Sequence, residues 1–320
     1  MPSPPDRDRA WSVPVVIATF VALAVVLFAR PLFGLGALLP VDIVEQAAPW
    51  RAAAPAGQVP DNPFLSDTLD VHTHFASLAD DLRSGTASWW DRSVGGGIPS
   101  LKAGLSPLLW LYLVVPAWYA PGLVAVVRTL VAAGLTYGFA RELRTDRAAA
   151  AVAGVAYAAS GFLMGWSGWP QSNVAAFLPG LFWAVERIVR RPSVRGAVPL
   201  AAVVAAMVVS NFPVITAYGL LAAGGYALAR LASLDRRPVS WVRPAAVAVW
   251  GGVLAALLAS LHLLAFGEYF EWADNSARGR LPADTSIGSD YLLSIPFPRP
   301  FGAHHTGPAF WGEGQNWVET

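Results

Sequence analysis

The sequence predicts an all-α polytopic membrane protein, and three observations support this fold class. Hydrophobic residues make up 55% of the 320 residues and charged residues only 13%, against about 25% charged residues in soluble domains. Apolar segments long enough to cross a bilayer, about 20 residues each, recur along the chain. Arginine gathers in every second connection between them, the asymmetry that orients membrane helices. The net charge of +1 argues against a nucleic-acid partner, and the chain has no cysteine for a thiolate site.

Seven apolar segments are predicted to span the membrane. They cover residues 12–33, 119–140, 148–164, 174–189, 196–209, 214–231 and 241–266. The first follows a polar start with Arg7 and Arg9 and precedes no small-residue cleavage site, so we expect a retained helix and not a cleaved signal peptide. Residues 105–118 are too few to span and contain Pro107 and Pro116, which predicts a re-entrant or interfacial helix.

The arginine pattern predicts a cytoplasmic amino terminus. The turns after the second, fourth and sixth spans are then cytoplasmic and Arg-rich, whereas the outside turns 165–173 and 210–213 contain no arginine. The outside face holds a long first extracytoplasmic loop, residues 36–106, and the polar segment 267–320. Basic residues are almost all Arg, as in GC-rich bacteria, so we expect one membrane domain in a bacterial plasma (inner) membrane. The chain ends without a closing element, which predicts an N-terminal piece of a longer protein.

The long loop is expected to contain an amphipathic helix on the outer membrane surface. Its apolar residues recur at helical spacing: Val71, Phe75, Leu78 and Leu82. Asp67, Asp70 and His74 fall on the opposite face, where a carboxylate could act as a general base toward a sugar or hydroxyl substrate. The alternative is structural, because Asp67 also suits a helix N-cap with Asp70 three residues later.

Two neighbouring histidines and one further aspartate complete the candidates near the loop. His72 and His74 would share a metal in a strand, but on the expected helix they point to nearly opposite sides. Asp42 follows the first span and would lie at the outer surface. It is a candidate second catalytic or donor-orienting carboxylate, and the alternative is an ordinary interfacial charge.

Arg128 is the most informative residue within the predicted spans. It lies about two turns from the outer end of the second span, where a charge is costly and usually faces a cavity or partner. A lipid phosphate is a suitable partner because a guanidinium can bind two phosphate oxygens at once. The alternative is an arginine that extends to the membrane surface.

Aromatic and amide residues are abundant in the predicted outside segments. Seven tryptophans lie there: Trp89, Trp90, Trp166, Trp169, Trp272, Trp311 and Trp317. Trp90 and Asn173 are the candidates for contact with a sugar substrate, since aromatic rings form platforms for sugars. An interfacial aromatic belt is the alternative explanation for the tryptophans.

Several short motifs, in order, resemble one known family. They are PVDIVEQAAPWR, NPFLSDTLDVHTHF, DDLRSGTASWWDRSVGGGIPSLKAGLSPLLW, LPGLFWAVERIVRR, NSARGR and PFPRPFG followed by WGEGQNWVET. Together they resemble the YfhO-type bacterial membrane proteins, which belong with the polytopic GT-C glycosyltransferases. The sequence departs from that pattern at Trp90 and Asp91, which stand where the family has Trp-Asn, and the preceding Pro is missing.

The resemblance implies glycosyl transfer on the extracytoplasmic face. The donor would be a polyprenyl-phosphate-linked sugar, and the acceptor an envelope glycopolymer, lipid or protein. Asp67, which matches the family's Ser-Asp, or Asp42 would be the general base. Arg278, which matches the family's Ser-x-Arg, or Arg128 would hold the donor phosphate, with Arg128 added on physical grounds alone. Some GT-C enzymes use a divalent cation, Mg²⁺ or Mn²⁺, and others use none, so this point stays open.

Two other functions compete with this one. A transporter or flippase of lipid-linked sugars should place polar groups near mid-bilayer and show repeated halves or broken helices. A non-catalytic scaffold for envelope assembly would not bring the candidate carboxylates to one cavity. The polar groups of this sequence lie mostly in the outside segments and no internal repeat is visible, which favours the enzyme.

Overall fold

The structure is a computed structural model. It describes residues 11–55, 57–60, 65–86, 90–91, 97–99, 106–233 and 238–272. The chain forms two compact units: Met1–Leu39 with Val71–Glu268, and Pro40–Asp70 with Tyr269–Thr320. Each unit is described by itself.

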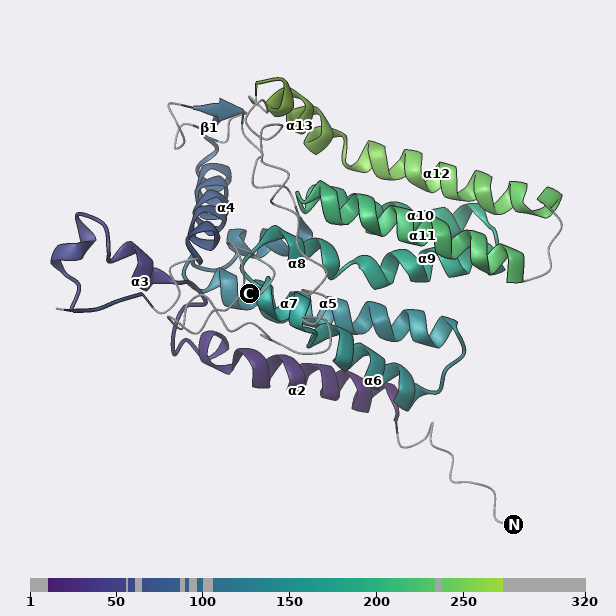
Figure 1. Ribbon diagram of the computed structural model, residues 1–320, viewed down its shortest axis with the longest axis horizontal. Coiled ribbons are helices and arrows are strands. Elements are labelled where there is room, and N and C mark those ends of the chain that lie inside the picture. Colours follow the sequence, from purple (N-terminus) through teal and green to yellow (C-terminus); the bar gives the residue numbers. More distant parts are fainter. Residues whose placement is uncertain are drawn as a thin grey trace, which may run out of the picture. The chain divides into compact units, whose positions relative to one another are not determined.

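The body of the first unit consists of helices, and the longer ones before α13 run roughly parallel or antiparallel to one another (Figure 1). These are α2 (Val13–Leu32), α5 (Ala120–Glu142), α6 (Arg147–Ala158), α7 (Gly161–Gly165), α8 (Pro170–Ala175), α9 (Leu178–Arg190), α10 (Ala197–Val209), α11 (Pro213–Ser233), α12 (Val242–Leu258) and α13 (Ser260–Trp272), with short 3-10 turns η4 (Val194–Gly196) and η5 (Pro238–Trp241). The second unit contains α3 (Val41–Val44) and η1 (Trp50–Ala52). A two-residue antiparallel pair, β1 (Trp90–Asp91) and β2 (Ile98–Pro99), is the only sheet in the described part of the chain.

The chain is a helical membrane protein, but the predicted count of seven spans is wrong. Four helical segments within the described residues are long and apolar enough to cross a membrane: α2, α5, Arg147–Gly165 (α6 with α7) and α11. A fifth follows if α12 and α13, which meet at a bend of 70°, count as one broken span. The predicted spans 174–189 and 196–209 are the two that fail.

Both failures have a local cause. The fourth predicted span divides into α8 and α9. Helix α9 has 13 residues, with Pro179 in its first turn and Pro192 just beyond its end. Proline favours the first turn of a helix and cannot continue one. Helix α10 also has 13 residues, and 13 residues reach only about 20 Å, less than the roughly 30 Å of hydrocarbon.

Small residues allow the helices of the first unit to approach closely. A Cβ added to Gly154 of α6 would lie 2.8 Å from the Ala133 carbonyl oxygen of α5 and 2.8 Å from the Phe20 ring of α2. Close backbone contact at small residues is typical of membrane helix pairs. The α5–α6 turn is fixed by Asp146, whose carboxylate accepts a hydrogen bond from the Ala149 amide at 2.7 Å and caps α6.

Helix α4 (Ser66–Ser84) confirms the predicted amphipathic helix, and its part from Val71 onward runs across the direction of the helix bundle (Figure 1). It packs on η3 (Pro107–Leu113), a 3-10 helix within the segment 105–118 that was predicted as a re-entrant or interfacial helix. Phe75 and Ala79 of α4 share a core with Leu108 and Tyr112 of η3. Leu82, predicted in the apolar stripe, is exposed, so the buried side of α4 is rotated from the predicted one.

Candidate functional site

Arg128 lies inside the first unit, in the third turn of α5, and its side chain is only 1% exposed. Its Nη1 donates to the Ser167 carbonyl oxygen at 2.6 Å and to the Ser172 hydroxyl at 2.8 Å. Ser172, in α8, donates in turn to the Trp169 carbonyl oxygen at 2.9 Å. The alternative that Arg128 extends to the membrane surface is therefore wrong, because the segment α7–α8 encloses its guanidinium.

Two of the three guanidinium nitrogens of Arg128 are buried without a hydrogen-bond partner among the described residues. These are Nε and Nη2, which form one edge of the planar group. No described carboxylate pairs with Arg128. A buried cation is stable only when it is paired and hydrogen-bonded, so this edge is suited to an anion with two oxygens.

Arg230 of α11 shows what the same edge does when it meets an anion. Its Nε and Nη2 donate to the two carboxylate oxygens of Glu186 at 2.9 Å and 2.8 Å. This is the two-donor geometry by which guanidinium groups bind carboxylates and phosphates. Arg128 offers an equivalent edge, more deeply buried, to which the described chain supplies no acid.

His72 and Tyr112 form a buried polar pair beside this region. The Nδ1 atom of His72 and the hydroxyl of Tyr112 share a hydrogen bond, and their rings stack with centroids 6.1 Å apart. Burial first, and then the positive charge of Arg128, lower the pKa of His72 to about 4. Burial also raises the pKa of Tyr112. Both groups are therefore neutral near pH 7 and leave Arg128 as the charged member of the three.

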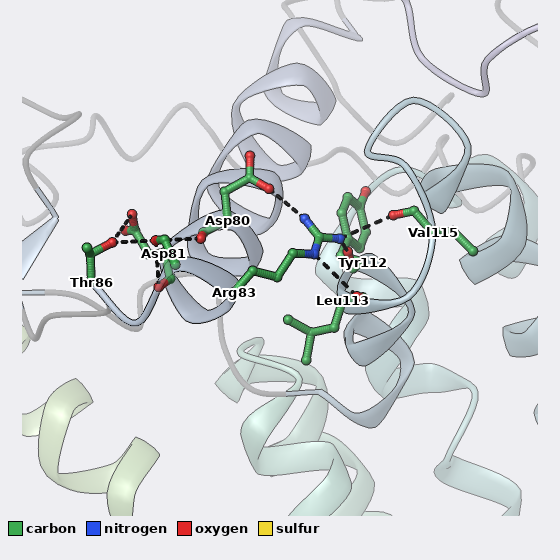
Figure 2. Close-up of polar contacts among 8 residues, drawn as sticks. Asp80, Asp81, Arg83, Thr86, Tyr112, Leu113 and Val115 are labelled. Atoms are coloured by element: carbon green, nitrogen blue, oxygen red, sulfur yellow. Dashed lines mark hydrogen bonds and ion pairs between the residues drawn. The ribbon is translucent and has the colours of Figure 1, made fainter.

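Arg83 fixes α4 to η3, and Figure 2 shows how its guanidinium reaches the end of the 3-10 helix. It donates to the backbone carbonyl oxygens of Tyr112, of Leu113 at 3.3 Å and of Val115 at 3.3 Å. The Asp80 carboxylate accepts a hydrogen bond from Nη1 of Arg83 at 2.5 Å and so orients the guanidinium. These carbonyls end a helix and lack intrahelical partners, so Arg83 satisfies them and holds Tyr112 where it meets His72.

The end of α4 is equally well defined. Gly85 adopts a φ of 69°. Its amide donates to the Leu82 carbonyl oxygen, and the Thr86 amide donates to the Asp81 carbonyl oxygen at 2.9 Å. This is the Schellman pattern, which favours glycine at the left-handed position. Side-chain contacts of Ser84 and Thr86, the latter with Asp81 (Figure 2), close the turn. The helix therefore stops directly after Arg83 and Ser84.

The predicted residues of the first unit have different surroundings. Asn173 is buried in α8, directly after the Ser172 that binds Arg128, and its Oδ1 has no hydrogen-bond partner in the described part of the chain. Trp90 is exposed on β1. His74 is buried, so its predicted place on an exposed face of α4 is wrong. The helix is buried on more than one side, and both His72 and His74 face inward.

The predicted carboxylates belong to the second unit. Asp42 lies in α3 and is partly buried. Asp67 lies in the first turn of α4, which begins at Ser66, so it is within the helix and not its N-cap. A carboxylate there still interacts favourably with the helix dipole. Asp67 and Asp70 are both exposed, as a base that meets a substrate must be.

Some predictions fall outside the described residues. These concern Arg278, Trp89, Trp311 and Trp317. Among the residues that are described, no three His, Asp or Glu side chains gather so as to hold a metal ion.

Sequence reasoning missed three of the residues that build this region. His72 was considered only as a metal ligand, although its spacing from Phe75 and Ala79, three and seven residues on, places it on their face. The contacts of Arg83 with backbone carbonyls have no sequence pattern. Tyr112 lies in the segment expected to be interfacial, but nothing in that segment indicates its partner.

Comparison with known proteins adds no family assignment. No protein-family model, no curated protein and no solved structure matches the chain.

Proposed function

We propose that the protein is a membrane glycosyltransferase in a bacterial plasma membrane, with a cytoplasmic amino terminus. It moves a sugar from a polyprenyl-phosphate donor to an envelope acceptor on the extracytoplasmic face. The observation that carries the proposal is the buried edge of Arg128, which has the geometry and charge for a phosphate. The resemblance to YfhO-type proteins supplies the reaction class.

The reaction forms one bond and breaks one. The acceptor hydroxyl oxygen attacks the anomeric carbon of the sugar, and a carboxylate takes the hydroxyl proton. The resemblance implies Asp67, or else Asp42, for this base. The bond from the anomeric carbon to the phosphate oxygen breaks, and its electron pair stays on the polyprenyl phosphate. The phosphate gains negative charge during this step, so a guanidinium bound to it interacts more strongly with the transition state than with the donor.

The surroundings of Arg128 support this role. Its fixed contacts with Ser167 and Ser172 hold the guanidinium in one orientation, so little reorganisation is needed when charge develops. Neutral His72 avoids a second cation in the same region and leaves the phosphate a single charged partner.

A transporter of lipid-linked sugars is the second candidate, and one observation favours it. The 70° bend between α12 and α13 is the kind of broken helix that transporters place at their substrate sites. Such a protein would also bind a lipid phosphate at Arg128, but it would release the sugar-lipid unchanged.

Sugar transfer by the full-length protein with Asp67→Asn separates the two candidates. This change keeps the size of the side chain and removes its basicity. Asp80→Asn, an exposed position farther along the same helix, is the control. The enzyme predicts loss of about 10²–10⁴-fold in transfer for a lost general base, with normal protein levels. Unchanged transfer would exclude Asp67 and direct the same test to Asp42. No transfer by the unmodified protein, together with movement of intact donor across vesicles, would make it a transporter.

A further inference from the structure

A buried ionic cluster lies in the first unit at the end away from Arg128. Glu186 of α9 is fully buried and accepts hydrogen bonds from Arg190, from Arg230 and from the Tyr226 hydroxyl at 2.7 Å. Two guanidinium groups therefore share one carboxylate, and the cluster keeps a net positive charge. Arg187 lies 3.6 Å from Glu142 at the end of α5, so the ends of α5, α9 and α11 meet here.

The whole of this end is positively charged. Between residues 141 and 243 the described part of the chain contains nine arginines and three carboxylates. The arginines are Arg141, Arg144, Arg147, Arg187, Arg190, Arg191, Arg195, Arg230 and Arg243. Such an excess attracts anionic lipid head groups on the cytoplasmic side of a membrane.

An apolar groove of about 700 Å³ opens among α9, α10, α11 and α12 and reaches this end. Ile188, Leu231 and Trp241, which neighbour the arginines in sequence, line it there. Leu220 and Gly252 line it farther along the helices. All of its described lining residues are apolar apart from the indole nitrogen of Trp241, and the volume falls in the range of small-molecule sites.

We propose that this groove binds one anionic membrane phospholipid, with an acyl chain in the groove and the phosphate at the Arg-rich end. Hydrocarbon is the favoured occupant of an apolar groove between membrane helices, because polar groups or water would leave hydrogen bonds unmade. A zwitterionic lipid would fill the groove equally well but would not neutralise the net charge of the Arg-rich end.

Trp241 supports this placement of the head group. It lies at the start of α12, lining the groove at the Arg-rich end, and indole rings favour the head-group level of a bilayer. The site is distinct from that of the proposed donor. Arg128 and Glu142 are fourteen residues apart on α5, which corresponds to about 21 Å along the helix.

Two adjacent glycines of α11 give a matched test. Gly224 lines the groove and Gly225 does not. Both are exposed, and a Cβ at either meets no atom within 4 Å. In Gly224→Leu the new side chain enters the groove, whereas in Gly225→Leu it points to another side of the same helix.

The measurement is native mass spectrometry of the full-length protein titrated with phosphatidylglycerol or with phosphatidylethanolamine. We expect the unmodified protein and Gly225→Leu to retain one phosphatidylglycerol in preference to phosphatidylethanolamine. Gly224→Leu should bind it at least about tenfold more weakly. If Gly224→Leu fails to fold, Gly252→Leu replaces it, since that side chain enters from α12 and also meets no atom within 4 Å.

Three outcomes would overturn the proposal. Equal loss in Gly224→Leu and Gly225→Leu would remove the groove as the site. Equal retention of both lipids would remove the role of the Arg-rich end. A protein dimer that disappears in Gly224→Leu would make a second copy of the chain the occupant. None of these outcomes depends on sugar transfer, so the proposal stands or fails separately from the proposed function.

Discussion

At the scale of single residues, Arg128 and Arg230 present the same guanidinium edge to different surroundings. The edge of Arg230 holds the carboxylate of Glu186, and its side chain remains partly exposed. The edge of Arg128 is buried, and no described acid meets it. Stability alone favours pairing a buried charge, so the unpaired arginine is the one that we assign to a ligand.

Glu186 gives a prediction about stability. Glu186→Gln leaves two arginines without their shared carboxylate, and breaking a buried ion pair costs about 3–5 kcal/mol. Glu142→Gln is the control, because its carboxylate is partly exposed and its arginine half-exposed, where a pair contributes about 0–1 kcal/mol. Thermal unfolding in lipid nanodiscs should show a large decrease in midpoint for Glu186→Gln only. Equal decreases would mean that the Glu186 cluster contributes no more than a surface pair.

His72 gives a prediction about pH. Its folded pKa, about 4, lies below the ordinary 6.5, so the unfolded chain binds the proton more readily. The stability that neutral His72 contributes is therefore present above pH 6.5 and is lost as the pH falls toward 4, by up to about 3 kcal/mol.

The test compares unfolding midpoints at pH 7 and pH 4.5 for the unmodified protein and for His72→Gln. The variant keeps a hydrogen-bonding side chain for Tyr112 but cannot titrate, so its midpoint should change less between the two pH values. The same change in both proteins would show that other groups cause the acid sensitivity.

At the scale of elements, the contact between α4 and η3 depends on Arg83. Arg83→Gln removes most of the donors that satisfy the carbonyls at the end of η3, so hydrogen exchange of amides in residues 72–84 should accelerate. Asp80→Asn is the control, because its carboxylate is mostly exposed and contributes little. Equal exchange in Arg83→Gln and the unmodified protein would mean that apolar packing alone holds α4.

Sequence patterns predicted the presence of individual helices well where the distribution of apolar residues alone determines them. The first span was predicted at 12–33 and α2 is Val13–Leu32, because apolar length defines a membrane helix. The helix in the long loop was predicted from apolar periodicity. Its buried side was not, because which side of α4 faces η3 depends on tertiary contacts such as His72 with Tyr112.

The span count failed for a different reason. Hydropathy detects apolar character but not helix breaks, so residues 174–189 and 196–209 were predicted as full spans. Pro179 and Pro192 limit α9 to 13 residues, and its Glu186 is buried through partners from α11 that lie 40 and 44 residues away in sequence. Of the candidate site, Arg128 was found because a charged residue in an apolar segment is visible in the sequence. Asn173 was chosen as an amide in an outside turn, and its burial beside Ser172 was not predicted.

At the scale of the whole molecule, the arginine pattern predicts the orientation of the chain. The natural sequence has no cysteine, so single introduced cysteines report their own exposure. Leu143→Cys and Val194→Cys, both at exposed positions of the Arg-rich end, should react with a membrane-impermeant thiol reagent only after the cells are opened. Val114→Cys, exposed after η3, should react in intact spheroplasts. The reverse labelling pattern would place the Arg-rich end outside.

Binding of the lipid-linked donor phosphate by Arg128 can be measured with polyprenyl phosphate and the full-length protein in nanodiscs. Arg128→Lys keeps the charge but loses the two-donor edge, so binding should weaken by about tenfold. Arg128→Gln also loses the charged hydrogen bonds, so binding should weaken by about a hundredfold or more. Arg30→Gln, the same change at an exposed arginine in the last turn of α2, should bind normally. Equal binding by Arg128→Gln and the unmodified protein, with both correctly folded, would show that Arg128 does not bind the phosphate.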